Sequence, residues 1–263
     1  MYDLAASICR RLDIGDVRFI EIESKHRVLP EQAEALREHL LELKKVRHKK
    51  ASFFFDQFLD TPKLDLLRLG ASLRLRYKRD AAHVYLQYKG PGFHKAGVLY
   101  RSEFSSGRLA DVVREESHHD VVHFTDTTVR DILETQAPTA MVRAMRRHLG
   151  SAVLARISVG TIVTLYQKDK FSVDLGSAEL EPSLDRIFAF HISRTGLHPL
   201  STFCEFENEV KAEQGDLRPK IEHLPDLLEF NGELAGKFDL RVERLDKYHR
   251  CAACFLPLST RRA

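Results

Sequence analysis

Charged and apolar side chains alternate along the segment FIEIESKH near the N-terminus. Because a β-strand sends every second side chain to the same face, Glu21, Glu23 and Lys25 project together, with Ile20 and Ile22 on the opposite face. A charged strand face ordinarily meets water, so a solvated surface is the first interpretation. An internal charged face becomes the better interpretation if other strands repeat the pattern.

Elements of two kinds follow along the chain. Segment 31–46 places apolar side chains at helical spacing behind Pro30, and this pattern predicts an amphipathic helix. Short strand-like segments come after it, and the short links between them favour antiparallel neighbours. These predicted strands lie near residues 51–60, 71–79, 83–90, 97–105, 151–165, 169–176 and 203–211.

Two stretches interrupt or follow these strands. Residues 107–150 have a mixed, partly helical pattern and are interpreted as an insertion, and residues 216–250 are interpreted as a helical tail that is broken at Asn231–Gly232. Neither low-complexity linkers nor clean repeats separate the segments. We therefore expect a single domain over residues 1–263.

Four further predicted strands repeat the alternation of the first. Their charged positions, each two residues from the next within a strand, are Arg74 and Arg76, then Lys89, then Arg101 and Glu103, and finally Glu205, Glu207, Glu209 and Lys211. If these strands close into a barrel whose apolar faces are covered by helices, the charged faces point inward. A barrel with a polar interior is a tunnel.

Such an interior limits what the tunnel contains. Burying an ion without compensation costs several kcal/mol, so water, mutual pairing or a ligand must offset the charge. The Lys and Arg side chains suit the oxygen atoms of phosphate groups. The Glu side chains would repel phosphate, but Mg²⁺ is typically held by one or two carboxylates together with phosphate oxygens. The pattern therefore indicates a metal-assisted site for a phosphate-rich anion.

Composition and charge exclude some function classes. The 41 Lys and Arg against 38 Asp and Glu give a net charge of +3, which is too balanced for a protein that coats DNA by bulk charge. With 43% hydrophobic and 30% charged residues, the chain can bury a core. No signal-peptide pattern and no apolar run of about 18 residues is present, so we expect a cytoplasmic protein without membrane contact.

Cysteines and histidines add little to this interpretation. Cys251 and Cys254 form a C-x-x-C pair, but the second half of a zinc site is missing, so unremarkable reduced thiols are the favoured interpretation. His118, His119 and His123 lie in a polar stretch and are interpreted as solvated loop residues.

Several motifs together resemble the CYTH family, the triphosphate tunnel metalloenzymes. Glu21-x-Glu23-x-Lys25 is similar to its N-terminal signature, and the blocks FLDTPKLDLLRLGASLRLR, LQYKGPG, YRSEF and CEFENEVK follow in family order. The resemblance implies an α+β fold, with a closed eight-stranded antiparallel β-barrel, a charged interior and helices packed outside. The insertion and the stretch 178–202 make this chain longer than the compact members.

The resemblance also implies roles for individual residues. The implied ligands for Mg²⁺ or Mn²⁺ are Glu21, Glu23, Asp174, Glu205, Glu207 and Glu209. The implied catalytic residues along the phosphate path are Lys25, Arg74, Arg76, Lys89 and Arg101. Glu103 would hold basic neighbours in place, and Arg156 and Lys247 are similar to later substrate-binding residues of the family.

The family resemblance implies several reactions rather than one. Metal-dependent hydrolysis of inorganic tripolyphosphate or a nucleoside triphosphate is the leading expectation; a class IV-type adenylyl cyclase that makes cyclic AMP and pyrophosphate, or a polyphosphate-handling enzyme, is the alternative. A non-catalytic sensor of polyphosphate or nucleotide is disfavoured, because binding an anion needs no carboxylates. The chain has no Trp, which removes the best stacking platform for an organic head group. A triphosphate-containing small molecule is the expected partner, and a homodimer is left open.

Overall fold

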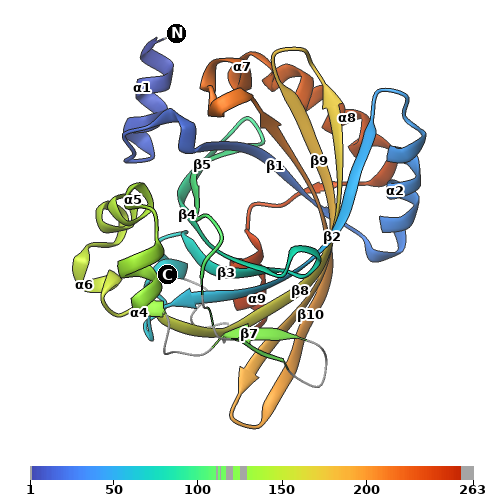
Figure 1. The fold of residues 1–263 in the computed structure, drawn as a ribbon. Helices are drawn as coiled ribbons and strands as arrows, with labels where there is room; N and C mark the ends of the chain where they lie inside the picture. Colours follow the sequence, from blue (N-terminus) through green and yellow to red (C-terminus); the bar gives the residue numbers. More distant parts are fainter. Residues whose placement is uncertain (1, 111, 113, 117–120, 125–128, 256–263) are drawn as a thin grey trace.

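Eight antiparallel strands form a closed ring in the computed structural model, which describes residues 2–110, 112, 114–116, 121–124 and 129–255 (Figure 1). Their order is β10–β9–β8–β2–β3–β4–β5–β1, and pairing of β1 with β10 closes the ring. The strands are β1 (Ile20–Val28), β2 (Arg47–Asp60), β3 (Ser72–Lys78), β4 (His83–Lys95), β5 (Val98–Ser105), β8 (Ser158–Asp174), β9 (Glu179–Ser193) and β10 (Gly196–Lys211). A two-residue strand, β11 (Arg241–Val242), adds to β1.

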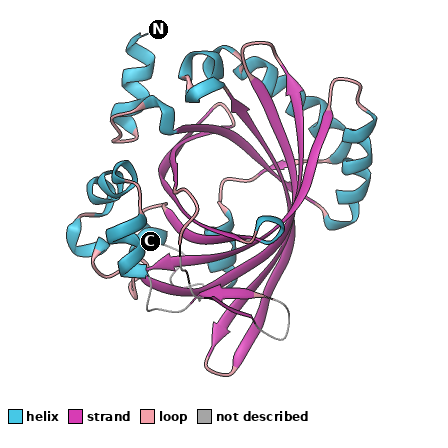
Figure 2. Cartoon of the chain, viewed as in Figure 1, coloured by secondary structure: helices cyan, strands magenta, loops and turns pink. Residues whose placement is uncertain are grey.

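Helices lie around the outside of this ring (Figures 1 and 2). They include α1 (Tyr2–Arg11), α2 (Ala33–Glu42), α3 (Asp65–Arg68), α7 (Leu217–Glu222) and α8 (Leu224–Phe238), with short 3₁₀ turns at Val17–Phe19, Pro30–Gln32, Arg79–Ala81 and Glu213–Gly215. The last described helix, α9 (Lys247–Phe255), packs against β8 and β10. The expected α+β ring with outer helices is confirmed. None of the described helices has the length and apolar character needed to cross a membrane.

Burial follows the alternation of the strands. Ile20 and Ile22 of β1 are fully buried in the core between the ring and its helices, together with Leu36 and Leu40 of α2. Removing each such side chain from water stabilises the fold by about 1.5–3 kcal/mol. The intervening charged residues of β1 face the interior of the ring instead. The hydrophobic effect thus fixes which face of the strand turns inward.

The elements between β5 and β8 pack on the outer face of the ring. They are the hairpin of β6 (Arg114–Glu116) and β7 (Val122–Phe124), then α4 (Val129–Asp131), a π-helical turn at Ile132–Gln136, α5 (Thr139–Leu149) and α6 (Ser151–Leu154). Helix α5 contacts β4 and β5, where the ring of His148 accepts or donates a 2.8 Å hydrogen bond with the Tyr88 hydroxyl. A Cβ on Gly90 would lie 2.8 Å from the His148 ring, so this contact requires glycine.

Three predictions about element boundaries are wrong. The predicted strands 151–165 and 169–176 form one strand, β8, which begins at Ser158 after α6. The polar run near Lys168 is not a turn, because alternate side chains of this run face the charged interior. The stretch 178–202, for which no strand was predicted, forms β9 and the first part of β10. The predicted helix 31–46 ends at Glu42, where β2 soon follows.

The helical tail also differs from the prediction. Helix α8 continues through Asn231–Gly232, and the tail is interrupted instead at His223 and again over residues 239–246, between α8 and α9. Asn231 is buried, and its side-chain amide donates to the Ser24 hydroxyl and accepts a 2.9 Å hydrogen bond from Asn208. These tertiary hydrogen bonds fix the helix against two strands. They override the weak helix propensity of the Asn-Gly pair.

Candidate functional site

A cavity of ≈ 200 Å³ lies inside the ring, and every strand of the ring contributes to its wall. Among the described residues, nine basic and seven acidic side chains line the cavity. The segment at the start of α9 also contributes to the wall, with Asp246, Lys247 and Tyr248. The cross-strand register explains this convergence. In the pairing of β1 with β10, for example, Lys25 lies opposite Glu207 and Glu23 lies opposite Glu209.

Most of the predicted site residues meet in this cavity. Those that line it are Glu21, Glu23, Lys25, Arg74, Arg76, Lys89, Arg101, Glu103, Glu207, Glu209 and Lys247. Glu205 is fully buried beside the cavity, in contact with Lys247. The structure does not bring the remaining two residues to the cavity.

Arg156 and Asp174 are those two residues, and for them the expectation is corrected. The Arg156 side chain is 50% exposed in the loop before β8 and pairs with Asp65 at 3.5 Å. Asp174 is exposed at the end of β8, where its carboxylate accepts a 2.8 Å hydrogen bond from the backbone of Gly176. Each has a local structural role outside the ring.

Asp56 is a central residue of the site that the sequence analysis missed. It is fully buried on β2, and its carboxylate accepts hydrogen bonds of 2.8 and 2.9 Å from Arg76 and pairs with Arg74 at 2.9 Å. Burial alone would raise the pKa of Asp56, but the two guanidinium groups lower it below its ordinary value. Asp56 therefore stays ionised and holds both arginines in place.

The carboxylate of Glu21 joins two basic residues on the opposite side of the cavity. Lys89 donates to it at 2.8 Å, and Arg101 donates to it at 2.8 Å and to Glu23 at 2.5 Å. Burial favours the neutral acid, yet Lys89 and Arg101 hold the pKa of Glu21 well below its usual range. Glu21 is consequently ionised although it is almost fully buried.

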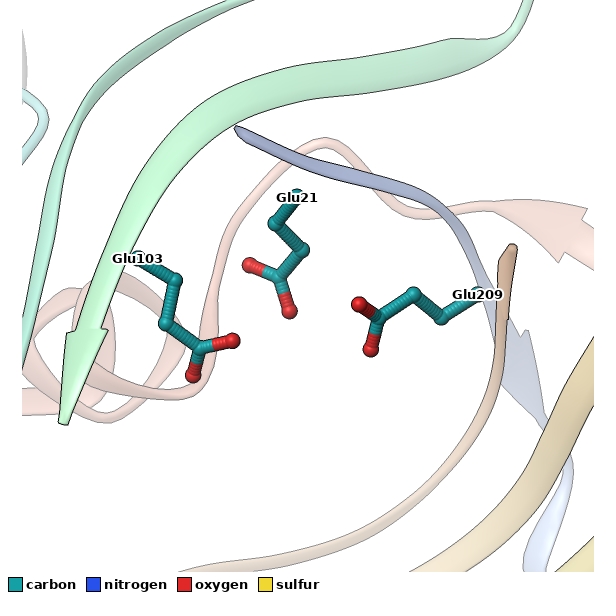
Figure 3. Close-up of side chains that lie close together, drawn as sticks. All are labelled: Glu21, Glu103 and Glu209. Atoms are coloured by element: carbon teal, nitrogen blue, oxygen red, sulfur yellow. The ribbon is translucent and has the colours of Figure 1, made fainter. Parts of the chain in front are cut away.

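Three carboxylates gather where β1, β5 and β10 meet. One oxygen each of Glu21, Glu103 and Glu209 lies within 4.8 Å of the others, and Figure 3 shows the three groups turned toward one another. Burial raises the pKa of Glu209 to about 7, and the negative charges of Glu21 and Glu103 add to this effect while Lys211 opposes it. This acidic trio (Glu21, Glu103 and Glu209) lies among three basic partners, Lys89, Arg101 and Lys211. Its hard oxygen ligands fit Mg²⁺ or Mn²⁺.

The acidic trio differs from the ligand set that the sequence predicted. Glu103 belongs to it in addition to its contact with Lys89 at 3.4 Å. Glu23 instead pairs with Arg101 and Lys25, and Glu207 pairs with Lys25 at 3.0 Å. Only geometry could show this, because all these glutamates have the same alternation in the sequence.

Two basic residues of β8 were also missed, and Lys211 of β10 was placed on the charged face without a role in the site. Lys168 donates to Glu207 at 2.8 Å, Lys170 donates to Glu181 at 2.7 Å, and Lys211 donates to Glu209 at 2.5 Å. The spacing of Lys168 and Lys170 is the same two-residue signal that identified Arg74 and Arg76. It was obscured because the predicted strand boundary fell between residues 165 and 169.

Among the residues that the structure describes, the cysteines and His123 form no group that could hold a metal ion. Cys251 is buried in α9 and Cys254 is exposed, and burial raises the pKa of the Cys251 thiol. His118 and His119 lie outside the described residues, and His123 is half-buried in β7.

His249 couples the start of α9 to pH. Its Nδ1 lies 2.7 Å from a carboxylate oxygen of Asp246, and its Nε2 lies 2.9 Å from the Leu67 carbonyl oxygen. Both ring nitrogens face acceptors, so the charged imidazolium satisfies both contacts. Burial lowers the pKa of His249, but Asp246 outweighs this effect and raises it above its ordinary value.

We expect the His249→Asn variant, which keeps a donor but no charge, to be less stable than the wild type by about 1 kcal/mol at low pH. Because the pKa of His249 is higher in the folded state than in the unfolded state, protonation of His249 stabilises the fold. This contribution is complete below the unfolded-state pKa of about 6.5 and is lost as the pH rises through the folded-state pKa. Urea unfolding between pH 6 and 9 measures the difference. A difference that stays constant over this range would contradict the charged imidazolium.

Comparisons with known proteins identify a family and a fold. A family model described as CYTH domain matches residues 20–222. The fold is similar to a candidate adenylyl cyclase of Hippeastrum that shows a dominant triphosphatase activity, with 19% identity, a TM-score of 0.54, and coverage of 90% of this chain and 98% of that chain. It is also similar to a candidate adenylate cyclase of Bacillus halodurans, with 19% identity, a TM-score of 0.50, and coverage of 88% and 96%. A comparison with curated protein sequences found no match.

Proposed function

The chain belongs to the CYTH domain family, whose model matches residues 20–222, and from this premise we propose that it hydrolyses inorganic triphosphate with a divalent cation. Its fold is shared by proteins named for cyclase and for triphosphatase activity. The fold therefore does not select one reaction, and the choice depends on the cavity of this chain.

The size and charge of the cavity carry the proposal. A volume of ≈ 200 Å³ lies below the roughly 300–1,000 Å³ of pockets that enclose drug-sized ligands. A phosphate chain fits such a space, whereas a nucleoside would have to remain outside it. Charged side chains dominate the wall, so the favourable contacts available are those with phosphate oxygens.

The aromatic part of the wall supports the same choice. Phe54 stacks on Tyr166 with ring centres 5.3 Å apart, and the Arg76 guanidinium lies 4.8 Å from the Phe54 ring centre. Phe58 and Tyr248 stack in the same way at 4.8 Å. These rings already contact one another and a cation, which favours a structural role over the stacking of a nucleobase.

The charge balance explains why a cation is needed. Nine basic side chains line the cavity, but seven lining acids and the buried Asp56, Asp185 and Glu205 behind them offset this charge, so no positive excess matches the several negative charges of a triphosphate. A bound Mg²⁺ or Mn²⁺ at the acidic trio would supply the missing positive charge and polarise phosphate oxygens. In this proposal the acidic trio holds the cation.

The basic residues would bind and orient the substrate. Arg74 and Arg76 are held by Asp56 with part of each guanidinium left toward the cavity, which permits forked hydrogen bonds to phosphate. Lys25, Lys89 and Arg101 lie on the neighbouring wall and would neutralise charge that develops as water displaces the leaving phosphate. Fixed donors of this kind accelerate hydrolysis because they need little reorganisation.

We expect the purified protein with Mg²⁺ or Mn²⁺ to convert tripolyphosphate into orthophosphate and pyrophosphate. ATP should be a poorer substrate, since the adenosine must stay outside the cavity. Product analysis by anion-exchange chromatography, with each metal and with a chelator as control, measures both reactions.

Two outcomes of this assay would contradict the proposal. Intact tripolyphosphate together with conversion of ATP into cyclic AMP and pyrophosphate would identify a cyclase. Turnover that is unchanged in excess chelator would remove the role of the divalent cation.

A further inference from the structure

The ammonium of Lys247 occupies the centre of a second group of carboxylates, away from the acidic trio. Its Nζ lies 2.9 Å from Asp185, 3.1 Å from Glu205 and 2.7 Å from Glu207. The carboxylates come from β9 and β10, and Lys247 reaches them from the first residue of α9. Asp185 and Glu205 are fully buried, so this carboxylate cage (Asp185, Glu205 and Glu207) lies in a region with little water.

The contacts of Lys247 leave an oxygen atom of the cage without a partner. Lys247 donates a 2.7 Å hydrogen bond to Glu207. Within the described part of the chain, Asp185 Oδ1 is buried and accepts no hydrogen bond, while the buried Glu205 Oε2 is contacted by the Lys247 ammonium at 3.1 Å. A buried carboxylate oxygen without a partner is costly. The three acids around Lys247, with Asp185 Oδ1 unpartnered, offer the hard oxygen ligands that a divalent ion takes.

Other basic residues hold the outer side of the cage. Lys168 lies 3.3 Å from Asp185 and donates to Glu207 at 2.8 Å. Arg250 donates to Glu205 at 2.9 Å. Lys25 also pairs with Glu207 at 3.0 Å. Of these four basic residues, Lys247 alone contacts all three carboxylates, so its removal leaves the centre of the cage without a cation.

Lys247 remains charged in this environment. Burial alone would lower the pKa of Lys247, but Asp185, Glu207 and Glu205 raise it well above its ordinary value. The ammonium is also tethered, since α9 packs against β8 and β10. A free cation must be drawn from solution, whereas this one is part of the folded chain.

We propose that Lys247 is a built-in cation in a latent divalent-metal site, so that the protein binds one metal ion, at the acidic trio, rather than two. The inference rests on the proposed function for the identity of that first ion. It also changes the assignment of Glu205 and Glu207, which serve as partners of Lys247 instead of metal ligands. Mg²⁺ holds oxygens at about 2.1 Å, so the cage must contract by roughly half an ångström or more toward an ion that replaces the ammonium.

Removing the Lys247 charge should convert the cage into a working metal site. We expect the Lys247→Met variant to bind two Mn²⁺ ions per chain, whereas the wild type binds one, as counted by electron paramagnetic resonance of free Mn²⁺ and by calorimetric titration. Lys170→Met is the matched control, because Lys170 lines the same cavity but pairs with Glu181 at 2.7 Å outside the cage. Lys247→Arg keeps the charge. Both of these variants should bind one ion.

The possible results separate this inference from the proposed function. A wild type that binds two ions, or a Lys247→Met variant that gains none, would overturn the inference. If the wild type binds no Mn²⁺ tightly, the metal site at the acidic trio in the proposed function is wrong. The inference about the cage is then still tested by whether Lys247→Met gains an ion relative to the wild type. If Lys247→Met folds only with metal, unfolding at graded Mn²⁺ gives the answer, and a variant that stays unfolded at saturating Mn²⁺ counts against the inference.

Discussion

A Glu21→Gln variant should lose tight Mn²⁺ binding and, with it, triphosphatase kcat/KM by a factor on the order of 10³. The substitution removes the buried member of the acidic trio that lies between Glu103 and Glu209. A metal ion contributes several kcal/mol of charge stabilisation in such sites, and each 1.36 kcal/mol corresponds to about a tenfold change in rate. No other substitution is expected to affect turnover more strongly.

The fold should survive this change. Lys89 retains Glu103 at 3.4 Å, and Arg101 retains Glu23 at 2.5 Å, so both basic partners of Glu21 keep an acid. Repulsion within the trio also falls. Glu42→Gln on the exposed end of α2 is the control. Calorimetry with Mn²⁺ and initial rates with tripolyphosphate measure the effect, and wild-type metal affinity in Glu21→Gln would remove Glu21 from the proposed site.

The ring and its charged interior could be predicted because a strand with two different faces leaves a clear signal. In β1, charged residues alternate with Ile20, Ile22 and Ser24 from Ile20 to Lys25. The charged face must therefore turn inward once helices cover the apolar face. The same signal located Arg74, Arg76 and Arg101. Alternation with a period of two residues shows that the two faces of a strand lie in different environments.

Other features could not be predicted because the same residue types occur in several environments. Residues 166–168 were interpreted as a break between two strands, but Lys168 faces acids inside the ring, as does Lys170 two residues later. Asp56 lies among the phenylalanines of β2, where a single acid carries little pattern of its own. Arg156 matched a motif only by type, and its position depends on the packing of the insertion.

The division of the glutamates between the trio and the cage depends on three-dimensional register. Glu207 and Glu209 are two residues apart on the same face of β10, yet Glu207 contacts Lys247 and Glu209 joins Glu21. Position along the tunnel separates them. Sequence spacing records the face of a strand but not which partner meets each residue across the cavity.

Asp56→Asn should be the most destabilising of the single substitutions considered for this site, with a loss of about 3–5 kcal/mol in the free energy of unfolding. The acid is fully buried and neutralises Arg74 and Arg76 together. An amide of the same shape leaves two guanidinium groups without their internal counter-charge. Urea unfolding of the variant and of Asp80→Asn, an exposed control on the turn before β4, measures the loss.

Tripolyphosphate should reverse much of this loss, because its oxygens can take the place of the missing carboxylate. Ligand that binds only the folded state stabilises it in proportion to the logarithm of its affinity. The rise in stability on adding tripolyphosphate should therefore exceed the wild-type rise by about 1.4 kcal/mol or more, which corresponds to about tenfold tighter binding. An equal rise in both proteins would mean that Arg74 and Arg76 do not contact the phosphate chain, since freeing them from Asp56 would then have no effect on the ligand.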